Sequence, residues 1–276
     1  MLTGIPPFAG NYTLLSRRDA PGGRALSIFN SALDVEHCPL NVLATKMKRY
    51  LITGASRGIG RAIAEKLASP DVELLLHGRD TVALAGVYKT VKQHCAHVVR
   101  LIHDLAVPSG VSDLIHQVGR NPLDLLVNNA GIAIVKPFCE ITSIEWEQTV
   151  GVNVTAPFML MQHFAPGMPP GSSIVNILSI AAKTGFPKWS AYCMSKFALE
   201  GFAQCVREEL RDRKIRMINV YPTATDTNIW THVEGEWPRH KMISPEDVAG
   251  AVAYALSCPR DVVLENISIS SLAGNL

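Results

Sequence analysis

Two residues four positions apart, Tyr192 and Lys196, carry side chains that can move a proton and stabilise the charge it leaves. The stretch around them predicts a helix, so both side chains leave the same face one turn apart. A free tyrosine hydroxyl has a pKa of ~10, and lowering it to about 7 requires about 4 kcal/mol. A neighbouring ammonium group can supply that energy at an effective dielectric constant of ~20. The pair predicts a catalytic proton donor and acceptor, although the same spacing is also common on plain surface helices.

A glycine-rich segment, TGASRGIG at residues 53–60, follows an apolar run and precedes the helical pattern RAIAEKLA. Glycines allow a tight turn and a close backbone approach, and the helix that follows directs its free amides at an anion. This context predicts the pyrophosphate site of a dinucleotide rather than an ordinary turn. The predicted cofactor contacts in it are Gly54, Ser56, Arg57, Gly58, Ile59 and Gly60.

The spacing TGxxxGxG, together with Tyr192 and Lys196 in YCMSK, resembles the classical short-chain dehydrogenase/reductase family. Extended members of that family carry TGxxGxxG, and Arg57 stands where their middle glycine would be. The resemblance runs from Lys48 to the C-terminus. It implies a Rossmann-type domain that transfers a hydride between a nicotinamide cofactor and a carbonyl or alcohol, with Tyr192 as general acid and base.

The resemblance also implies two further catalytic residues. Ser179 lies thirteen residues before Tyr192, after an apolar run, where the family has a serine that hydrogen-bonds the substrate oxygen. Asn153, in VGVNVTAPF, matches an asparagine that holds a water beside the lysine and completes a proton relay. Lys196 is also expected to hold the nicotinamide ribose, so Tyr192 and Lys196 count among the cofactor contacts.

Several other motifs resemble the family's cofactor contacts. They are Asp104 and Leu105 near the adenine, Asn129, Ala130 and Gly131 within NNAG near the ribose, and Pro222, Thr225 and Thr227 in YPTATDT near the nicotinamide. Thr223 departs from the family pattern, because a glycine is usual there. A β-branched residue would be strained if that position needed a positive φ. Leu178 in place of a second serine, and the lack of a glycine-rich ending, are further departures.

The choice between NAD and NADP depends on the charge at the end of the second predicted strand, ELLLHGRD. A carboxylate there would accept the ribose 2′-hydroxyl but repel a 2′-phosphate. Gly78 stands where NAD-using relatives carry the acid, with Arg79 next to it and Arg57 in the glycine turn. These residues favour NADP(H) over NAD(H), unless Arg79 pairs with Asp80 instead.

The expected reaction is therefore reduction of a carbonyl by NADPH, or the reverse oxidation of an alcohol. The alternatives are an NAD-dependent alcohol dehydrogenase and a non-catalytic NADP(H)-binding sensor or regulator on the same fold. Apolar residues flank the tyrosine and the last cofactor motif and predict an apolar substrate pocket under a mobile lid, or else core packing. They are Phe186, Trp189, Ile229, Trp230, Val233 and Trp237.

The elements that must position these residues alternate between short apolar runs and helical stretches. This rhythm predicts α/β class: one doubly wound Rossmann-type domain, its seven-stranded, mostly parallel sheet covered by helices on both faces. Ser244 and Pro245 predict the cap and first turn of a helix that ends near Ser257. The predicted strands are 49–53, 72–77, 97–101, 123–127, 173–178, 216–221 and 262–270.

Residues 1–46 differ from the rest, with turn signals and no sustained periodicity, so we expect the domain to span 47–276. We interpret them as a disordered extension or as sequence before the true start at Met47. A transit peptide is the alternative, which Asp19, Asp34 and Glu36 disfavour.

Bulk composition excludes several classes of function. The chain has 276 residues, 47% of them hydrophobic, a net charge of +2, and scattered basic residues, so neither a nucleic-acid partner nor a membrane span is expected. Its six separated cysteines predict free thiols and no metal site. We expect a cytoplasmic homodimer or homotetramer that acts on a small-molecule substrate.

Overall fold

The computed structural model describes residues 47–233 and 235–274, and the predicted extension lies outside them. Seven parallel strands form one sheet in the order β3-β2-β1-β4-β5-β6-β7. The order reverses direction between β1 and β4, as in a doubly wound fold. The strands are β1 (Lys48–Ile52), β2 (Val72–His77), β3 (His97–Leu101), β4 (Leu125–Asn128), β5 (Ser173–Ile177), β6 (Arg216–Pro222) and β7 (Asn266–Ile269).

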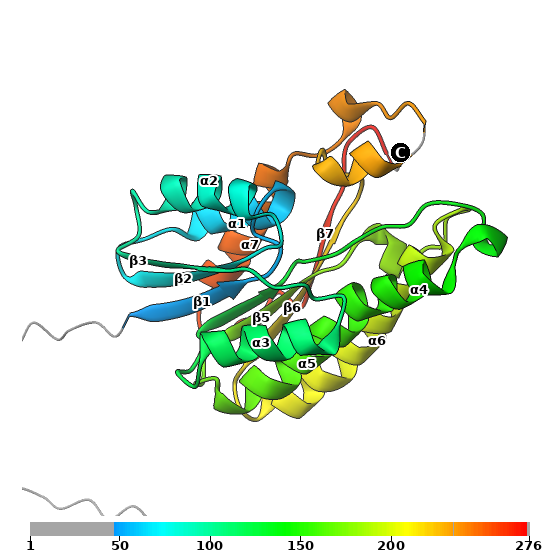
Figure 1. The fold of residues 1–276 in the computed structure, drawn as a ribbon. Helices are drawn as coiled ribbons and strands as arrows, with labels where there is room; N and C mark the ends of the chain where they lie inside the picture. Colours follow the sequence, from blue (N-terminus) through cyan, green and yellow to red (C-terminus); the bar gives the residue numbers. More distant parts are fainter. Residues whose placement is uncertain (1–46, 234, 275–276) are drawn as a thin grey trace, which may run out of the picture. The chain divides into compact units, whose positions relative to one another are not determined.

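Helices cover both faces of this sheet (Figure 1). One face carries α1 (Gly58–Leu67), α2 (Thr81–Val91) and α7 (Pro245–Ser257), and the other carries α3 (Pro108–Val118), α4 (Ser143–Val150), α5 (Ala156–Phe164) and α6 (Ser190–Arg211). Successive strand residues point to opposite faces. Leu51 accordingly packs in the core under α3, α5 and α6, while Ile52 packs in the core under α1, α2 and α7. The predicted fold class is confirmed.

The helix that contains Asn153 is continuous from α4 to α5 through one π-helical turn, Gly151–Thr155. Such a turn widens the helix locally and is frequent at functional sites. Short 3₁₀ turns lie at Phe138–Glu140, Ala165–Gly167, Ile180–Ala182, Asn228–His232 and Arg239–Lys241.

The predicted start of the last helix is confirmed. Ser244 caps α7, and its side chain and that of Asp247 bond each other's backbone amides in a capping box. The last strand is shorter than predicted, because β7 pairs with β6 only from Asn266, opposite Asn219. Within the described ranges no helix is long and apolar enough to cross a membrane, and five cysteines are free thiols.

Candidate active site

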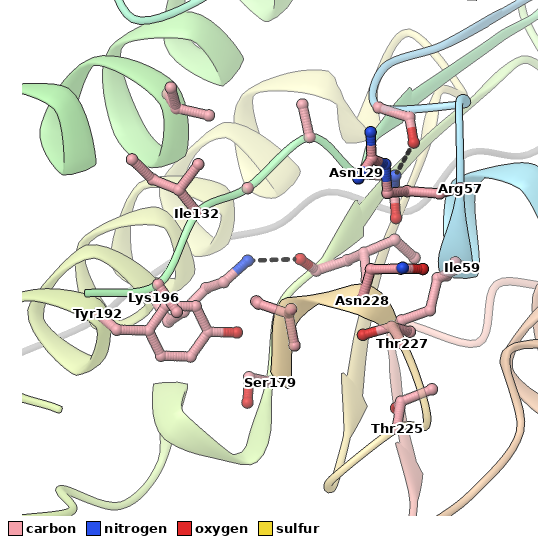
Figure 2. Close-up of a pocket in the computed structure, with 18 of the residues that line it drawn as sticks. Arg57, Ile59, Asn129, Ile132, Ser179, Tyr192, Lys196, Thr225, Thr227 and Asn228 are labelled. Atoms are coloured by element: carbon pink, nitrogen blue, oxygen red, sulfur yellow. Dashed lines mark hydrogen bonds between the residues drawn. The ribbon is translucent and has the colours of Figure 1, made fainter. Parts of the chain in front are cut away.

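A cavity of about 890 Å³ opens at the carboxyl ends of the strands, where the strand order reverses. Its lining includes the glycine turn, the end of β2, the NNAG segment, the end of β5, Tyr192 and Lys196 of α6, and the loop after β6. In Figure 2, Tyr192, Lys196 and Ser179 lie on one side of the view, and Arg57, Ile59 and Asn129 on the other. Segments that are far apart in the sequence thus share one cavity.

The glycine turn adopts the backbone conformation that its residues suggest. Gly54 and Gly58 have φ angles of 65° and 54°, which favour glycine. A Cβ on Gly60 would overlap the Gly54 carbonyl and the Asn129 side chain. Gly60 therefore lets α1 pack tightly behind the turn and does not itself line the cavity.

The first turn of α1 has no side-chain cap, because its N-cap residue is Arg57. The free amides at such a helix start, with the positive end of the helix dipole, suit an anion. Arg57, Gly58 and Ile59 of this start line the cavity.

His77, the last residue of β2, contacts the backbone of the glycine turn. It is 2% exposed, its Nδ1 lies 3.4 Å from the Gly54 amide nitrogen, and its Nε2 lies 3.0 Å from the His103 carbonyl oxygen. Burial lowers the pKa of His77 to about 4, so the ring is neutral at pH 7. A neutral ring with its proton on Nε2 can accept from Gly54 and donate to His103.

Tyr192 and Lys196 lie on one face of α6, as their spacing predicts. The Lys196 Nζ lies 5.5 Å from the Tyr192 ring centroid and donates a hydrogen bond of 2.8 Å to the Ile177 carbonyl (Figure 2). Burial lowers the pKa of Lys196 to about 8, which leaves it mostly cationic at neutral pH.

The expected lowering of the tyrosine pKa is not observed. Burial raises the pKa of Tyr192 to about 12, and the Ser179 hydroxyl acts in the opposite direction. The Lys196 ammonium donates its hydrogen bond to the Ile177 carbonyl at the end of β5, and it is not among the causes of the shift in the Tyr192 pKa. Tyr192 therefore keeps its proton at neutral pH, the form that a proton donor needs.

Asn153 lies behind the cavity wall and does not line it. Its Oδ1 accepts from the Ile132 amide at 2.9 Å, and its Nδ2 donates to the Ile132 carbonyl and to the Ser195 hydroxyl, each at 2.9 Å. The Ser195 hydroxyl in turn donates to the Tyr192 carbonyl. Asn153 thus ties the segment after NNAG to the helix that carries Tyr192.

The two arginines at the other end of the cavity are paired with acids. The Arg57 Nη2 lies 2.5 Å from the Oδ2 of Asp80, the residue that caps α2. The Arg79 Nη1 lies 3.6 Å from the Asp104 Oδ1. Both arginine side chains are about half exposed. A Cβ on Gly78 would lie 3.1 Å from the Ser56 Cβ, so a larger residue would crowd the turn there.

Thr223 is not strained. Lys188 and Lys214 are the described non-glycine residues with positive φ, and Thr223 is not among them. Its backbone continues the pairing of β6 by donating from its amide to the Ile269 carbonyl, and its hydroxyl accepts from the Ser271 amide. The loop that carries Thr225 and Thr227 is therefore formed without the usual glycine.

Most of the remaining predicted residues also reach the cavity. Of the predicted contacts, Gly60 and Asn153 do not line it, and neither does Val233 of the predicted apolar pocket. His77 and several residues beside known motifs line the cavity without having been predicted. For His77 the available signal is a lone histidine that closes the apolar run VELLLH. The unpredicted lining residues are His77, Ala106, Ile132, Ala133, Ile134, Gln148, Val152, Ile177, Ile180, Ala181, Ala224 and Asn228.

The sequence profile described as short chain dehydrogenase matches residues 48–236, which includes all four predicted catalytic residues. The chain belongs to the short-chain dehydrogenase/reductase family. Sepiapterin reductase of Chlorobaculum tepidum is 33% identical over 237 residues, which cover 82% of this chain and 97% of that protein.

Solved structures of other short-chain dehydrogenases share the fold. Landomycin C-6 ketoreductase LanV, with bound NADP and rabelomycin, has a TM-score of 0.70 and 31% identity over 81% of this chain and 94% of its own. A short chain dehydrogenase of Burkholderia cenocepacia in complex with NADP has a TM-score of 0.73 and 28% identity over 82% and 97%. The chain therefore spans nearly the whole of these relatives.

Proposed function

We propose that this short-chain dehydrogenase/reductase uses NADPH to reduce a ketone or aldehyde, with Tyr192 as the proton donor. One observation carries the proposal: Tyr192, Lys196 and Ser179 line the same cavity as the glycine turn at the start of α1. A cofactor bound along this cavity would reach from an anion site to a proton donor. The NADP held by the family members described above supports this proposal.

The residues present fit a dinucleotide. The positive φ values of Gly54 and Gly58 and the uncapped amides of α1 suit the pyrophosphate. Asn129, Ala130 and Gly131 would line the ribose, Asp104 and Leu105 the adenine, and Pro222, Thr225 and Thr227 the nicotinamide. When bound, the cofactor supplies a hydride to the carbonyl carbon.

In this proposal the protein's own groups bind and protonate the substrate oxygen. Ser179 donates a hydrogen bond to it and stabilises negative charge as it develops. Tyr192, protonated at neutral pH, donates its proton to the oxygen and completes the alcohol. Lys196 would hold the nicotinamide ribose and favour the tyrosinate that remains. Asn153 fixes Ile132 and α6, and a water beside it would return the proton from solvent.

NADP(H) is proposed over NAD(H) because two arginines, Arg57 and Arg79, line the cavity and the position of the NAD-binding acid is Gly78. The acids Asp80 and Asp104 hold these guanidinium groups in place. A 2′-phosphate would meet positive charge there, and each charge-assisted contact is worth about 1.5–3 kcal/mol.

The decisive experiment compares the wild type with Tyr192→Phe on a panel of aldehydes and ketones, following NADPH consumption. We expect kcat to fall by at least about a hundred-fold while the NADPH Kd stays within about two-fold, since the proton donor is lost but the pocket is kept. Equal turnover by the variant would contradict the role of Tyr192. NADPH binding with no turnover of any carbonyl by the wild type would favour a cofactor-binding sensor.

We also propose that the protein forms a homodimer or homotetramer through α4, α5 and α6. Exposed apolar side chains are present on these helices, at Ile144, Trp146, Phe158 and Phe197. Burying them against a second copy would remove apolar surface from water.

A further inference from the structure

Four aromatic rings form a chain that starts at the proposed proton donor. Tyr192 and Trp189 have ring centroids 5.6 Å apart, Trp189 and Trp230 5.7 Å, and Trp230 and Trp237 4.7 Å. The first two pairs meet edge to face, the geometry that aromatic quadrupoles favour. All four residues line the cavity, so we call Trp189, Trp230 and Trp237 its aromatic wall.

The backbone and the cofactor loop hold Trp189 and Trp230 of this wall in place. The Trp230 indole donates a hydrogen bond of 2.8 Å to the carbonyl of Thr225, in the loop proposed to bind the nicotinamide. Trp189 follows Lys188, whose φ of 68° is unusual for a residue with a side chain. The Lys188 carbonyl accepts from the Lys136 amide at 2.9 Å, which fixes that turn. Such anchoring is expected of rings that receive a ligand in one orientation.

Further apolar side chains line the cavity, namely Phe186, Ile132, Ile134 and Ile180. Ile132 lies on the same side of Figure 2 as Tyr192 and Lys196, whereas Asn228 lies beside Ile59 and Thr227 at the other end. Gln148 adds a neutral polar group to the lining. Among the described lining residues, the charged side chains are Arg57, Arg79, Asp80, Asp104 and Lys196. The first four lie around the turn and the strand ends assigned to the adenosine, and Lys196 bonds Ile177. A carboxylate or phosphate on the substrate would find no counter-ion of its own in this part of the described structure.

We propose that the substrate is an uncharged ketone that bears an aromatic ring, which packs on Trp189 and Trp230 while its carbonyl meets Tyr192 and Ser179. This rests on the proposed function for the reaction and adds the class of substrate. An aromatic ring gains from the wall beyond the apolar area it buries, whereas a saturated ring of the same size gains only the area. The wall thus selects a flat π-system over an aliphatic ring.

The test uses two bicyclic ketones with the same carbon skeleton, α-tetralone, which has one aromatic ring, and α-decalone, which has none. Their Kd values are measured by calorimetry on protein saturated with NADP⁺, and their KM and kcat values with NADPH. We expect α-tetralone to bind about three- to ten-fold more tightly than α-decalone. Trp230→Leu should remove most of this preference, and Trp230→Phe should retain most of it.

Trp146→Leu is the matched control, because Trp146 is an equally large residue on α4 that does not line the cavity. It should leave the preference unchanged. Equal binding of the two ketones by the wild type, or a preference that survives Trp230→Leu, would overturn the aromatic substrate class. Absence of turnover with the binding preference intact would count against the proposed reaction and in favour of the aromatic site.

Discussion

At the scale of single residues, the pKa values give Tyr192 and Lys196 different protonation states and charges in the cavity. Tyr192 has a raised pKa of about 12 and Lys196 a lowered pKa of about 8, both because of burial. At neutral pH the first is a neutral donor and the second a cation. Alcohol oxidation needs the tyrosinate and carbonyl reduction needs the phenol. The neutral phenol is the form that the proposed carbonyl reduction requires of Tyr192.

Arg79→Ala tests the residue proposed to bind the 2′-phosphate. We expect the NADPH Kd to rise by about ten- to a hundred-fold and the NADH Kd to change by less than about two-fold, because one charge-assisted contact is lost. Cofactor titrations by fluorescence measure both constants. Arg211→Ala is the control, since Arg211 pairs with Glu208 at the end of α6 and does not line the cavity. A parallel loss of NADPH and NADH binding by Arg79→Ala would refute a role in choosing the cofactor.

At the scale of elements, a buried polar network joins the segment after Ser179 to α6 and β6. Glu200 is 5% exposed and accepts from Lys183 at 2.8 Å, from Asn219 at 2.9 Å and from Tyr221 at 2.6 Å. Burial alone would raise the pKa of Glu200, but the hydrogen bonds from Lys183 and Tyr221 outweigh it and the pKa is lowered. The network therefore holds the Ser179 turn at a fixed place beside the helix of Tyr192.

Glu200→Ala should destabilise the protein by about 3 kcal/mol, because it leaves the Lys183, Asn219 and Tyr221 donors without their shared acceptor. Glu200→Gln, which retains one acceptor oxygen, should cost about half as much. Urea unfolding followed by circular dichroism measures both values. Glu208→Ala provides the comparison, because Glu208 is an exposed residue on the same helix. If Glu200→Ala were no more destabilising than Glu208→Ala, the network would have no structural role.

At the scale of the whole molecule, stability and the proposed assembly depend on contacts between different elements. His77 joins the glycine turn to the end of β3, and the exposed apolar side chains of α4, α5 and α6 belong to one layer of helices. His77 affects how stability changes with acid, and the exposed apolar side chains affect the proposed association of two or more copies.

The protein should lose stability as pH falls from about 6.5 to about 4. The pKa of His77 is lowered in the folded state, so the unfolded chain takes up a proton in this range and the folded chain does not. The stability linked to the neutral ring is complete above the unfolded pKa and decreases below it, by up to about 3 kcal/mol. Thermal unfolding across this range measures the effect. A His77→Asn variant should show a shallower dependence, and an equal slope would rule His77 out as the cause.

Replacing Phe197 with glutamate should shift the proposed oligomer towards monomer, because a buried charge at an interface lacks compensation. Light scattering after size-exclusion chromatography measures the mass. Tyr254→Glu, an exposed aromatic on α7 at the other face of the sheet, is the control. A monomeric wild type, or an unchanged mass for the Phe197 variant, would contradict assembly through α6.

The sequence by itself determined the sheet, its helical layers, the glycine turn and the spacing of Tyr192 and Lys196, because these depend on local periodicity and local backbone conformation. Tertiary structure decided the environments. The tyrosine pKa is raised rather than lowered, because burial and the direction of the Lys196 ammonium depend on β5. Asn153 hydrogen-bonds Ile132. Arg57 forms an ion pair with Asp80, and Arg79 forms one with Asp104. Trp189, Trp230 and Trp237 pack in a row that begins beside Tyr192. Such contacts join residues far apart in the chain, and no local pattern encodes them.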